Sequence, residues 1–425
     1  MAYNEAVEMF SPRAVEVTAD NLAAAGRYLE SMQARGGTNI HDALIESLRQ
    51  PPENDRLPIV LFLTDGRPTI GRTDEKSIRA AAESANRYGK RVFTFGVGVD
   101  VNSPLLEHVA SESRGTATFV LPGEDIELKV ARMFERLSGP VLASPQLTVL
   151  DEHGRPAAGR TRDLIPWRLP DLFDRDQLVL LGQYLGDGPL VFRLSGHCPD
   201  GKRSFQFRFD LDKATTRNSF VPRLWAQRKI AVLVDAIRAS GAERPGARPE
   251  VADPRVKELV DEIVRLSTEF GVLTEYTAFL AREGTDLTRT EQLAREAWHS
   301  FDARARQVRS GLGAINQDVN LRSQKSAGQL NYRNSYWDAN MDRAQVTSVQ
   351  QVADRAFYRK GGRWVDSRLV NQTDAGAAQR AVEYGSEEHM ELARQLARDN
   401  RQGALMMHGE ILLDVDGQAV LVRNQ

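Results

Sequence analysis

Apolar residues in the first part of the chain alternate between two spacings. In Asn21–Gln33 and Asn39–Gln50 they lie three or four positions apart, which predicts amphipathic helices, whereas Ile59–Leu63 is a continuous apolar run, which predicts a strand covered on both faces. The alternation continues with a helix at Glu75–Tyr88, a strand at Arg91–Val99, a helix at Ser103–Ser113, a strand at Thr116–Leu121 and a helix at Asp125–Leu137. This order predicts an α/β domain with a mainly parallel sheet over residues 1–138.

The pattern changes after residue 138, where short apolar runs are separated by Gly, Pro and Asp-Gly turns. The runs are Leu147–Leu150, Leu178–Leu181, Leu190–Leu194 and Ser204–Phe209. They predict a β-rich domain over residues 139–215, built on a small antiparallel sheet. A helical region over 216–284 follows, with helices at Pro222–Ser240 and Asp253–Arg282 joined by the Pro-, Gly- and Ala-rich linker Gly241–Ala252.

The last part of the chain is more polar. Residues 285–350 are expected to form a helix and a polar linker, because Gly311–Gln350 is rich in Asn, Gln and Ser and lacks periodicity. We expect this linker to be partly disordered. Residues 351–425 predict a small α+β segment, in which the hairpins Ala356–Val365 and Glu410–Val422 flank a helix at Glu387–Arg401.

Composition narrows the classes of function. With 425 residues, the chain is long enough for two or three domains. Its formal net charge of −2 argues against a general affinity for nucleic acid or a membrane surface. The single cysteine, Cys198, excludes an intrachain disulfide and a cysteine-based zinc site. No run approaches the roughly 18 apolar residues of a membrane span, so no membrane span is expected in this chain.

Candidate chemistry is concentrated at two places in the α/β domain. Thr38 follows Gly36-Gly37 at the start of a predicted helix, and Asp65 precedes Gly66 at the carboxyl end of a predicted strand. The sequence pattern GGTNI…LTDG resembles that of the von Willebrand factor type A domain. The resemblance is strongest to the version of this domain in inter-alpha-trypsin inhibitor heavy chains and their bacterial relatives. Further segments are similar to that family as far as about Glu283; they are Pro170–Phe173, Gln177–Tyr184, Arg223–Ile230 and Leu266–Leu280.

The resemblance implies a doubly wound fold and a metal-ion-dependent adhesion site. In the family a first strand ends in Asp-x-Ser-x-Ser, whose side chains join the later Thr and Asp around one divalent ion. This chain has no Asp with Ser at both +2 and +4. Because Met1–Phe10 resembles the second strand of the family, we expect the opening strand and its helix to lie upstream of Met1. The α/β domain is thus interpreted as amino-terminally truncated, without its first strand.

The family mechanism assigns a role to each remaining ligand. Thr38 would ligate Mg²⁺ (or Mn²⁺ or Ca²⁺) directly or nearly so, and Asp65 would hold a bound water. The ion would be under-neutralised and would accept a carboxylate from a partner protein with an acidic side chain. Mg²⁺ is coordinated by six oxygens, so one hydroxyl and one carboxylate are too few to form its binding site. We therefore expect metal binding only when the missing Asp-x-Ser-x-Ser segment is restored.

Simpler interpretations of both residues exist. Thr38 could be the N-cap of the helix Asn39–Gln50, and Asp65 could be a turn residue of an Asp-Gly pair. Two other functional hypotheses stay open: a hydrolase or transferase that uses Asp65 at the switch point of the sheet, and a metal-independent structural remnant. An enzyme would need a second acid, base or phosphate cradle near Asp65, and none stands at a recognisable spacing, so we interpret the protein as non-enzymatic.

The expected contact surface is the rim at the carboxyl ends of the strands. It should combine Gly36–Asn39, Asp65–Pro68 and the loop Gly98–Ser103. Two other motifs are weak. In Gly96-Val97-Gly98 the third glycine of a dinucleotide loop would fall at Val101, and Asp414-x-Asp416-Gly417 is interpreted as a hairpin turn.

Overall fold

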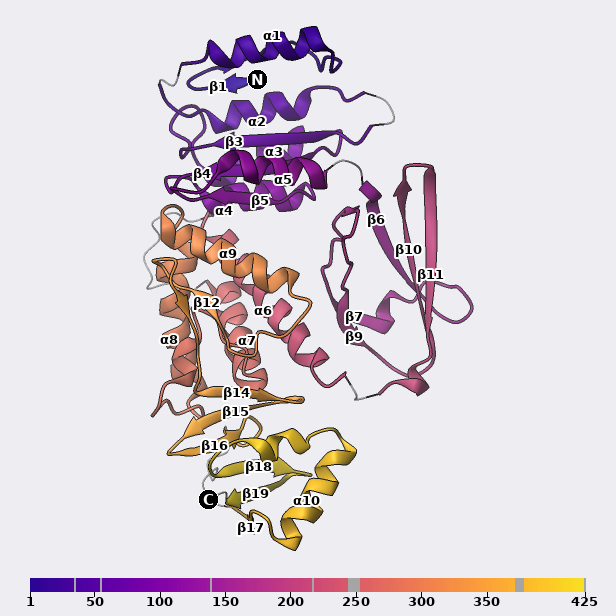
Figure 1. The fold of residues 1–425 in the computed structure, drawn as a ribbon, viewed down its shortest axis with the longest axis vertical. Coiled ribbons are helices and arrows are strands. Elements are labelled where there is room, and N and C mark those ends of the chain that lie inside the picture. The colour runs from indigo at the N-terminus through magenta and orange to yellow at the C-terminus, as the bar shows by residue number, and fades with distance from the viewer. Residues whose placement is uncertain are drawn as a thin grey trace.

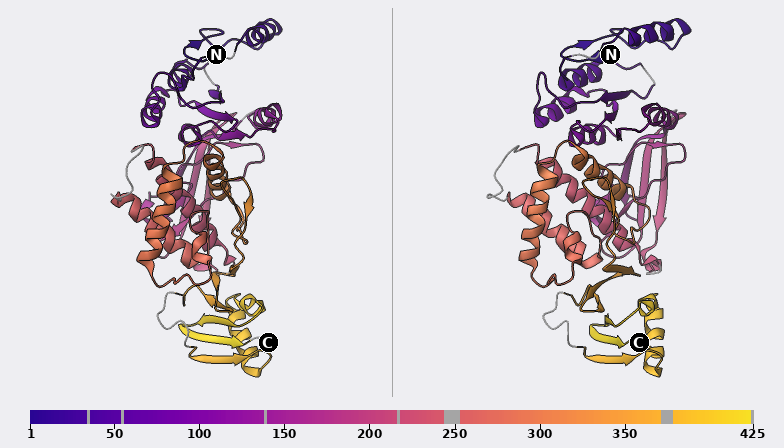
Figure 2. Two further views of the ribbon diagram at one scale, coloured as in Figure 1. Left: turned by 90° about the vertical axis from the view of Figure 1, so that its left-hand side faces the viewer. Right: turned by 60° about the vertical axis from the view of Figure 1, so that its left-hand side comes forward.

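A computed structural model describes residues 1–33, 36–53, 56–137, 140–215, 218–243, 253–370 and 378–423. The molecule is elongated, with the α/β domain at one end, the helical region in the middle and the small α+β segment at the other end (Figure 1). The β-rich domain lies beside the helical region. The same succession along the long axis is visible in both views of Figure 2.

The α/β domain is built on a parallel sheet in the order β3-β4-β5. Its strands are β3 (Ile59–Thr64), β4 (Arg91–Val97) and β5 (Ala117–Val120). Its helices are α1 (Ala19–Glu30), α2 (Ile40–Arg49), α3 (Glu75–Ala85), α4 (Ser103–Glu112) and α5 (Ile126–Arg136). Val92 packs in a core with α2, α3 and α4, whereas Phe93 and Phe95 pack beside residues of α5. Because successive side chains of a strand point to opposite faces, helices cover both faces. The predicted α/β fold class is confirmed.

The prediction of one strand over Met1–Phe10 is wrong. Two short strands, β1 (Ala2–Tyr3) and β2 (Val7–Glu8), pair antiparallel with each other instead of joining the parallel sheet. Tyr3 still contacts β3, since its hydroxyl donates to the carbonyl oxygen of Leu63 over 2.9 Å and its ring stacks on Phe62. Among the described strands, β3 therefore has one sheet neighbour and forms an edge.

Several large apolar side chains of the α/β domain are exposed to solvent. Leu61 and Leu63 of β3 are 40% and 41% exposed, and α1 buries none of its residues against the described parts of the chain. Leu22 and Leu29 of α1 are exposed as well. Large apolar residues scattered singly on a surface are ordinary, but the exposed leucines of β3 lie on an unpaired edge strand, which another element can cover.

The β-rich domain contains the predicted antiparallel sheet. Four strands pair in the order β11-β10-β6-β8, and β7 pairs with β9. The strands are β6 (Pro140–Leu150), β7 (Thr161–Ile165), β8 (Leu172–Phe173), β9 (Leu181–Tyr184), β10 (Leu190–Cys198) and β11 (Gly201–Phe209). The buried carboxylate of Asp171 accepts from Nε and Nη2 of Arg91 at 2.5 and 3.2 Å, and so attaches this domain to strand β4.

The helical region departs from the prediction at two places. It contains α6 (Val221–Ser240), α7 (Pro254–Phe270), α8 (Thr290–Ser300), a π-helix (Phe301–Arg306) and α9 (Leu312–Ser326). The helix expected over Asp253–Arg282 ends at Phe270, because Gly271 adopts φ 63°, a left-handed conformation that ends helices. Residues 244–252 of the predicted linker Gly241–Ala252 lie outside the described residues.

The predicted linker over Gly311–Gln350 is also wrong, because α9 is a packed helix. Ile315 is fully buried in the core of the α/β domain. The polar residues of α9 that suggested a linker form a buried network: the amides of Asn316 and Asn320 donate to the carboxylate of Glu275 at 2.9 and 2.8 Å, and Gln317 accepts from the hydroxyl of Tyr276 at 2.6 Å. Buried polar groups are tolerated when they are hydrogen-bonded in this way.

Residues beyond α9 form short strands and one mixed sheet. The short strands are β12 (Tyr336–Trp337) and β13 (Arg343–Ala344). The mixed sheet contains β14 (Val349–Val352), β15 (Arg355–Lys360), β16 (Arg363–Asp366), β17 (Arg380–Glu383), β18 (Ile411–Val415) and β19 (Gln418–Arg423), with helix α10 (Glu387–Arg398) beside it. Short 3₁₀ helices occur at Ala158–Arg160, Leu211–Lys213, Ala278–Ala281 and Gln402–Met406. Both predicted hairpins are confirmed, as β15-β16 and β18-β19.

Helix α9 should contribute strongly to the stability of the α/β domain. We expect Ile315→Ala to lower the free energy of unfolding by about 2 to 4 kcal/mol, because it removes fully buried methyl groups and leaves a cavity. The matched control is Leu312→Ala on the same helix, which should cost less than about 1 kcal/mol because Leu312 is 38% exposed. Denaturant titration followed by circular dichroism measures both. Equal, small losses would show that α9 is not part of this core.

The segment Met1–Ser138 should fold poorly by itself. It lacks the covering residues of α9, and it keeps an edge strand whose outer backbone groups have no sheet partner among the described strands. Loss of one well-packed buried side chain such as Ile315 costs about 2 to 4 kcal/mol, while a whole domain is stable by only about 5 to 15 kcal/mol. We expect aggregation or a broad thermal transition by calorimetry, and cooperative unfolding in a version extended upstream by one strand and one helix. A sharp transition of the isolated segment as a monomer would contradict this expectation.

Candidate metal and partner site at the end of strand β3

The structure brings Thr38 and Asp65 to the same edge of the sheet. Asp65 follows the last residue of β3, and Thr38 lies in the loop that enters α2. Gly66 permits the close approach, because a Cβ at this position would lie 3.1 Å from Oγ1 of Thr38. The backbone N–H of Thr38 donates to the hydroxyl of Thr69 over 2.8 Å, and the N–H of Thr69 donates to the carbonyl of Thr38 over 3.0 Å. The two loops are thus fastened together.

Asn39, rather than Thr38, is the N-cap of α2. Its side-chain oxygen accepts from the backbone N–H of Asp42 at 3.2 Å, and its amide donates to the carboxylate of Asp42 at 2.7 Å and to the carbonyl of Glu5 at 3.2 Å. Asn39 is buried. The alternative interpretation of Thr38 as a helix cap is therefore wrong. Within the described residues, the Thr38 hydroxyl makes no hydrogen bond and is available to a ligand.

Asp65 is likewise unengaged. Its carboxylate is exposed, and no described side chain forms a hydrogen bond or ion pair with it. The nearby guanidinium of Arg67 is directed elsewhere, to the carboxylate of Asp100 at 2.9 Å. The negative charge of Asp65 is nevertheless felt by Tyr3: burial raises the pKa of the Tyr3 phenol to about 12, the hydrogen bond with Thr64 opposes this shift, and the charge of Asp65 adds to it.

The turn between β1 and β2 is a part of the site that the sequence did not predict. The backbone N–H of Asn39 donates to the carbonyl of Asn4 over 2.8 Å, so this turn holds the start of α2. The Glu5 side chain covers Gly36, where a Cβ would lie 3.0 Å from Oε1 of Glu5. Asn4, a residue type that favours turns, was the available signal.

One part of the expected contact rim is closed. The backbone N–H of Gly311 donates to the carbonyl of Val99 over 2.8 Å, and the N–H of Ser103 donates to the carbonyl of Arg309 over 3.2 Å. Val101, inside this loop, is fully buried. The segment before α9 therefore covers part of the predicted loop Gly98–Ser103, whereas Asp100 in the same loop stays exposed and pairs with Arg67. The open part of the rim consists of Gly36–Asn39 and Asp65–Pro68, with Asp100 beside them.

The side-chain oxygens at this rim can fill only part of the coordination shell of a metal ion. Mg²⁺ takes six oxygens in an octahedron, whereas Thr38 and Asp65 offer a hydroxyl and a carboxylate. Within the part of the chain that the structure describes, no group of three or more His, Cys, Asp or Glu residues is placed to hold a metal ion. Thr38 and Asp65 can thus fill two positions, and the others need water or atoms from elsewhere.

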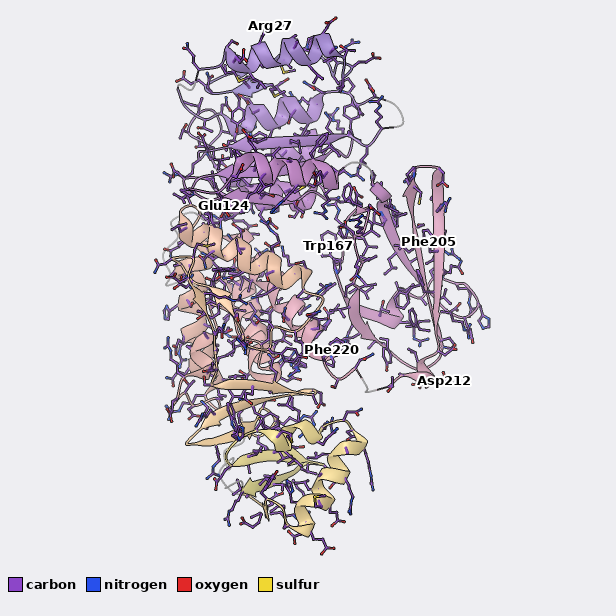
Figure 3. All side chains as sticks on the ribbon, viewed as in Figure 1. Arg27, Glu124, Trp167, Phe205, Asp212 and Phe220 are labelled. Carbon is purple, nitrogen blue, oxygen red and sulfur yellow. The ribbon has the colours of Figure 1, made fainter. Side chains whose placement is uncertain are left out.

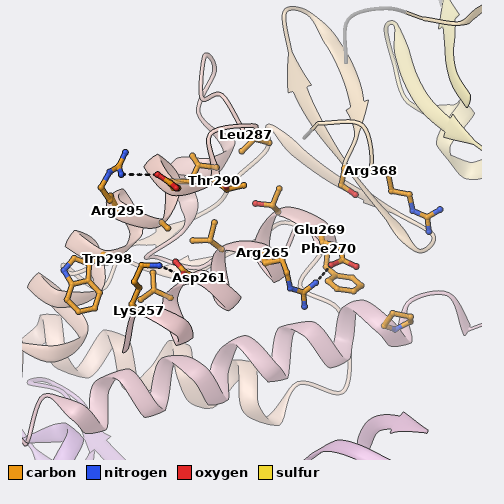
Figure 4. Close-up of a pocket in the computed structure, with 18 of the residues that line it drawn as sticks. Lys257, Asp261, Arg265, Glu269, Phe270, Leu287, Thr290, Arg295, Trp298 and Arg368 are labelled. Carbon is orange, nitrogen blue, oxygen red and sulfur yellow. Dashed lines mark hydrogen bonds and ion pairs between the residues drawn. The ribbon is translucent and has the colours of Figure 1, made fainter. Parts of the chain in front are cut away.

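A separate groove of about 1100 Å³ lies between α7 and α8 (Figure 4). Its floor is apolar and includes Val264 and Trp298. The charged residues on its rim pair with one another; Nζ of Lys257 is 2.6 Å from the carboxylate of Asp261. The groove is lined by other elements than the rim that holds Thr38 and Asp65.

Comparison with known proteins identifies the class. Residues 2–119 match the family model of the von Willebrand factor type A domain, so this region of the chain is such a domain, of a class that typically mediates protein–protein interaction. Over much of its length the chain is similar to inter-alpha-trypsin inhibitor heavy chains. It is 25% identical over 330 residues to human inter-alpha-trypsin inhibitor heavy chain H4, and 27% identical over 292 residues to human heavy chain H6. The resemblance seen in the sequence is confirmed.

The matches differ in extent. The match to H4 covers 73% of this chain and 33% of H4, and the match to H6 covers 63% of this chain and 21% of H6, so the chain spans about a third or less of the relatives it matches. A solved structure titled von Willebrand factor type A from Catenulispora acidiphila aligns with a TM-score of 0.40 and 16% identity, covering 60% of this chain and 66% of that one. No helix in the described residues has the length and apolar character needed to span a membrane.

Stability measurements should separate the structural residue of this site from the two unengaged ones. We expect Asn39→Ala to lower the free energy of unfolding by about 1 to 3 kcal/mol, because it removes a helix cap and leaves buried groups unpaired. Thr38→Ala and Asp65→Ala should each change it by less than about 0.5 kcal/mol. Chemical denaturation measures all three. A large loss in Asp65→Ala would show that Asp65 is a structural turn residue.

Proposed function

We propose that this chain is a non-enzymatic protein-interaction module, and that its contact surface is the open rim at the carboxyl end of β3. The observation that carries the proposal is that the Thr38 hydroxyl lies beside Gly66, the residue after Asp65, and that neither this hydroxyl nor the Asp65 carboxylate has a partner among the described residues. Groups needed only for folding are usually satisfied inside the fold, as Asn39 is. Unused donors at the edge of a parallel sheet are typical of a ligand site.

The partner proposed is a protein that presents an acidic side chain. A divalent ion such as Mg²⁺, or Mn²⁺ or Ca²⁺ in its place, would supply positive charge that attracts a carboxylate. Thr38 is a neutral ligand and Asp65 carries one negative charge, so the two residues leave a divalent charge under-compensated. Arg67 does not neutralise Asp65, because it pairs with Asp100. Asn39 and Gly66 hold the two donors in place.

The remaining ligands are proposed to come from an Asp-x-Ser-x-Ser segment that joins the domain at the free edge of β3. Two features favour this position. The described strands leave the outer edge of β3 unpaired, and Leu61 and Leu63 expose apolar surface that a strand and its helix would cover. The same addition would place new hydroxyl and carboxylate donors at the carboxyl end of the sheet, beside Thr38 and Asp65.

Catalysis by Asp65 is less well supported than binding. General acid–base or nucleophilic chemistry needs a second group that takes or gives a proton within hydrogen-bond reach. Among the described residues, Asp65 has no such side-chain partner, and the nearby hydroxyl of Tyr3 is engaged by the carbonyl of Leu63. A binding role needs no second group from this chain.

Calorimetric titration with Mg²⁺ and Mn²⁺ tests the metal part of the proposal. The chain by itself should bind either ion weakly, with an apparent Kd in the millimolar range or above. Micromolar affinity that disappears in Asp65→Ala would contradict the incomplete donor set. In a form completed with Asp-x-Ser-x-Ser, Thr38→Ala and Asp65→Ala should each abolish metal-dependent partner binding. The matched control Glu46→Ala removes an exposed carboxylate on α2 and should retain it. Retained binding by either ligand variant would exclude the adhesion mechanism.

A further inference from the structure

Strand β11 is an edge strand of its sheet, and its side chains are exposed to solvent. Every residue from Gly201 to Phe209 is exposed. In the four-stranded sheet β11 pairs with β10 on one side, and none of the described strands pairs with its other side. Figure 3 labels Phe205 on this outermost strand of the β-rich domain. A long exposed edge strand with apolar side chains is uncommon in a monomer, because its free backbone groups pair readily with another strand.

The two faces of β11 differ in chemistry. Phe205, Phe207 and Phe209 alternate on one face and are 39%, 50% and 53% exposed. They stand opposite Leu194, Phe192 and Leu190 of β10, so they extend the apolar face of the sheet to its rim. Phe209 also contacts the edge of the Phe192 ring, with 5.7 Å between the centroids. The other face carries the polar residues Lys202, Ser204, Gln206 and Arg208.

We propose that β11 pairs with β11 of a second copy of this chain, antiparallel and about a two-fold axis at Phe207. In this register Phe207 opposes Phe207 of the second copy, and Phe205 opposes Phe209. Every aromatic residue of the strand then meets an aromatic residue, the kind of cross-strand pair that stabilises sheets. The contact is isologous, so it closes a dimer and leaves no further free edge on β11.

Avoidance of like charges favours this register. With the axis at Phe207, Arg208 opposes Gln206 of the second copy and Ser204 opposes Asp210, so like charges stay apart. An axis at Phe205 would bring Lys202 opposite Arg208, two positive charges. An axis at Gln206 would place Phe209 opposite Arg203, which is already paired with Asp200 within its own hairpin. The axis at Phe207 alone among these three satisfies both faces.

A second copy fits this edge better than a foreign strand does. The pattern of β11 is complementary to itself in one antiparallel register, on its aromatic face and its polar face alike. The edge lies on the β-rich domain, whereas the proposed partner site lies on the α/β domain, which contains β3 (Figure 1). Self-pairing therefore leaves the proposed partner site open, and the two proposals can fail independently.

A disulfide trap tests the register in the full chain. Directly opposed residues of antiparallel strands have Cα atoms about 4.5 to 5.5 Å apart, within the range that a disulfide bridges. In a Cys198→Ser background, Phe207→Cys should give a covalent dimer under mild oxidation, whereas the matched control Phe205→Cys, four residues from its own counterpart, should give at least tenfold less. Equal trapping in both variants, or none in Phe207→Cys, would overturn the proposed pairing.

Sedimentation velocity tests the association itself. The unmodified chain should sediment as a dimer at micromolar concentration, and Phe207→Glu should reduce the association constant at least tenfold, because it places two negative charges opposite each other at the axis. The control Phe134→Glu changes a 70% exposed phenylalanine on α5 and should leave the dimer intact. Circular dichroism spectra of both variants check that each one folds. A chain that stays monomeric, or a Phe207→Glu variant that associates as well as the unmodified chain, would contradict the proposal.

Discussion

The ion pair between Glu75 and Arg309 is the interaction on which the arrangement of this molecule depends. Glu75 starts helix α3 and is buried; its carboxylate accepts from Nε of Arg309 at 3.0 Å and from the amide of Asn102 at 3.2 Å. Arg309 also donates to the carbonyl of Arg238 on α6 at 2.9 Å. A charge buried without partners is strongly unfavourable, so this pair and its hydrogen bonds must form together. They hold the helical region against the α/β domain and bring Ile315 into its core.

This attachment decides which part of the sheet rim is accessible. The segment before α9 closes the carboxyl end of β4, where Val101 is buried, and leaves the carboxyl end of β3 open. Thr38 and Asp65 stand at the open end with unengaged oxygens, and the free edge of β3 lies beside them. The same domain is thus rigidly supported on one side and incompletely covered on the other. The proposed interaction module needs this combination, because its binding residues must be both fixed and accessible.

Much of the fold could be predicted from hydrophobic spacing, and the failures have physical causes. The alternation of strands and helices, the antiparallel sheet and both hairpins follow from apolar periodicity and turn residues. The approach of Thr38 to Gly66, which follows Asp65, agrees with the order of the strands. Helix α9 was missed because its polar residues are buried in a network with Glu275, which only tertiary contacts reveal. Asn39 was missed as a cap because Thr38, one residue earlier, is an equally suitable residue type. The turn at Asn4 could not be predicted from the resemblance of Met1–Phe10 to a strand of the family. In this chain β1 pairs with β2 in a local hairpin instead of forming one longer strand.

Amide hydrogen exchange of the full chain tests most directly whether the α/β domain is supported by the helical region. If the Glu75–Arg309 pair and Ile315 unite them, the amides of Arg91–Val97 and Leu312–Ser326 should exchange slowly and with the same free energy of opening, since they belong to one cooperative unit. The amides of Ile59–Thr64 should exchange faster, because one edge of this strand is unpaired among the described strands. Rapid exchange over Leu312–Ser326 while Arg91–Val97 stays protected would contradict this account.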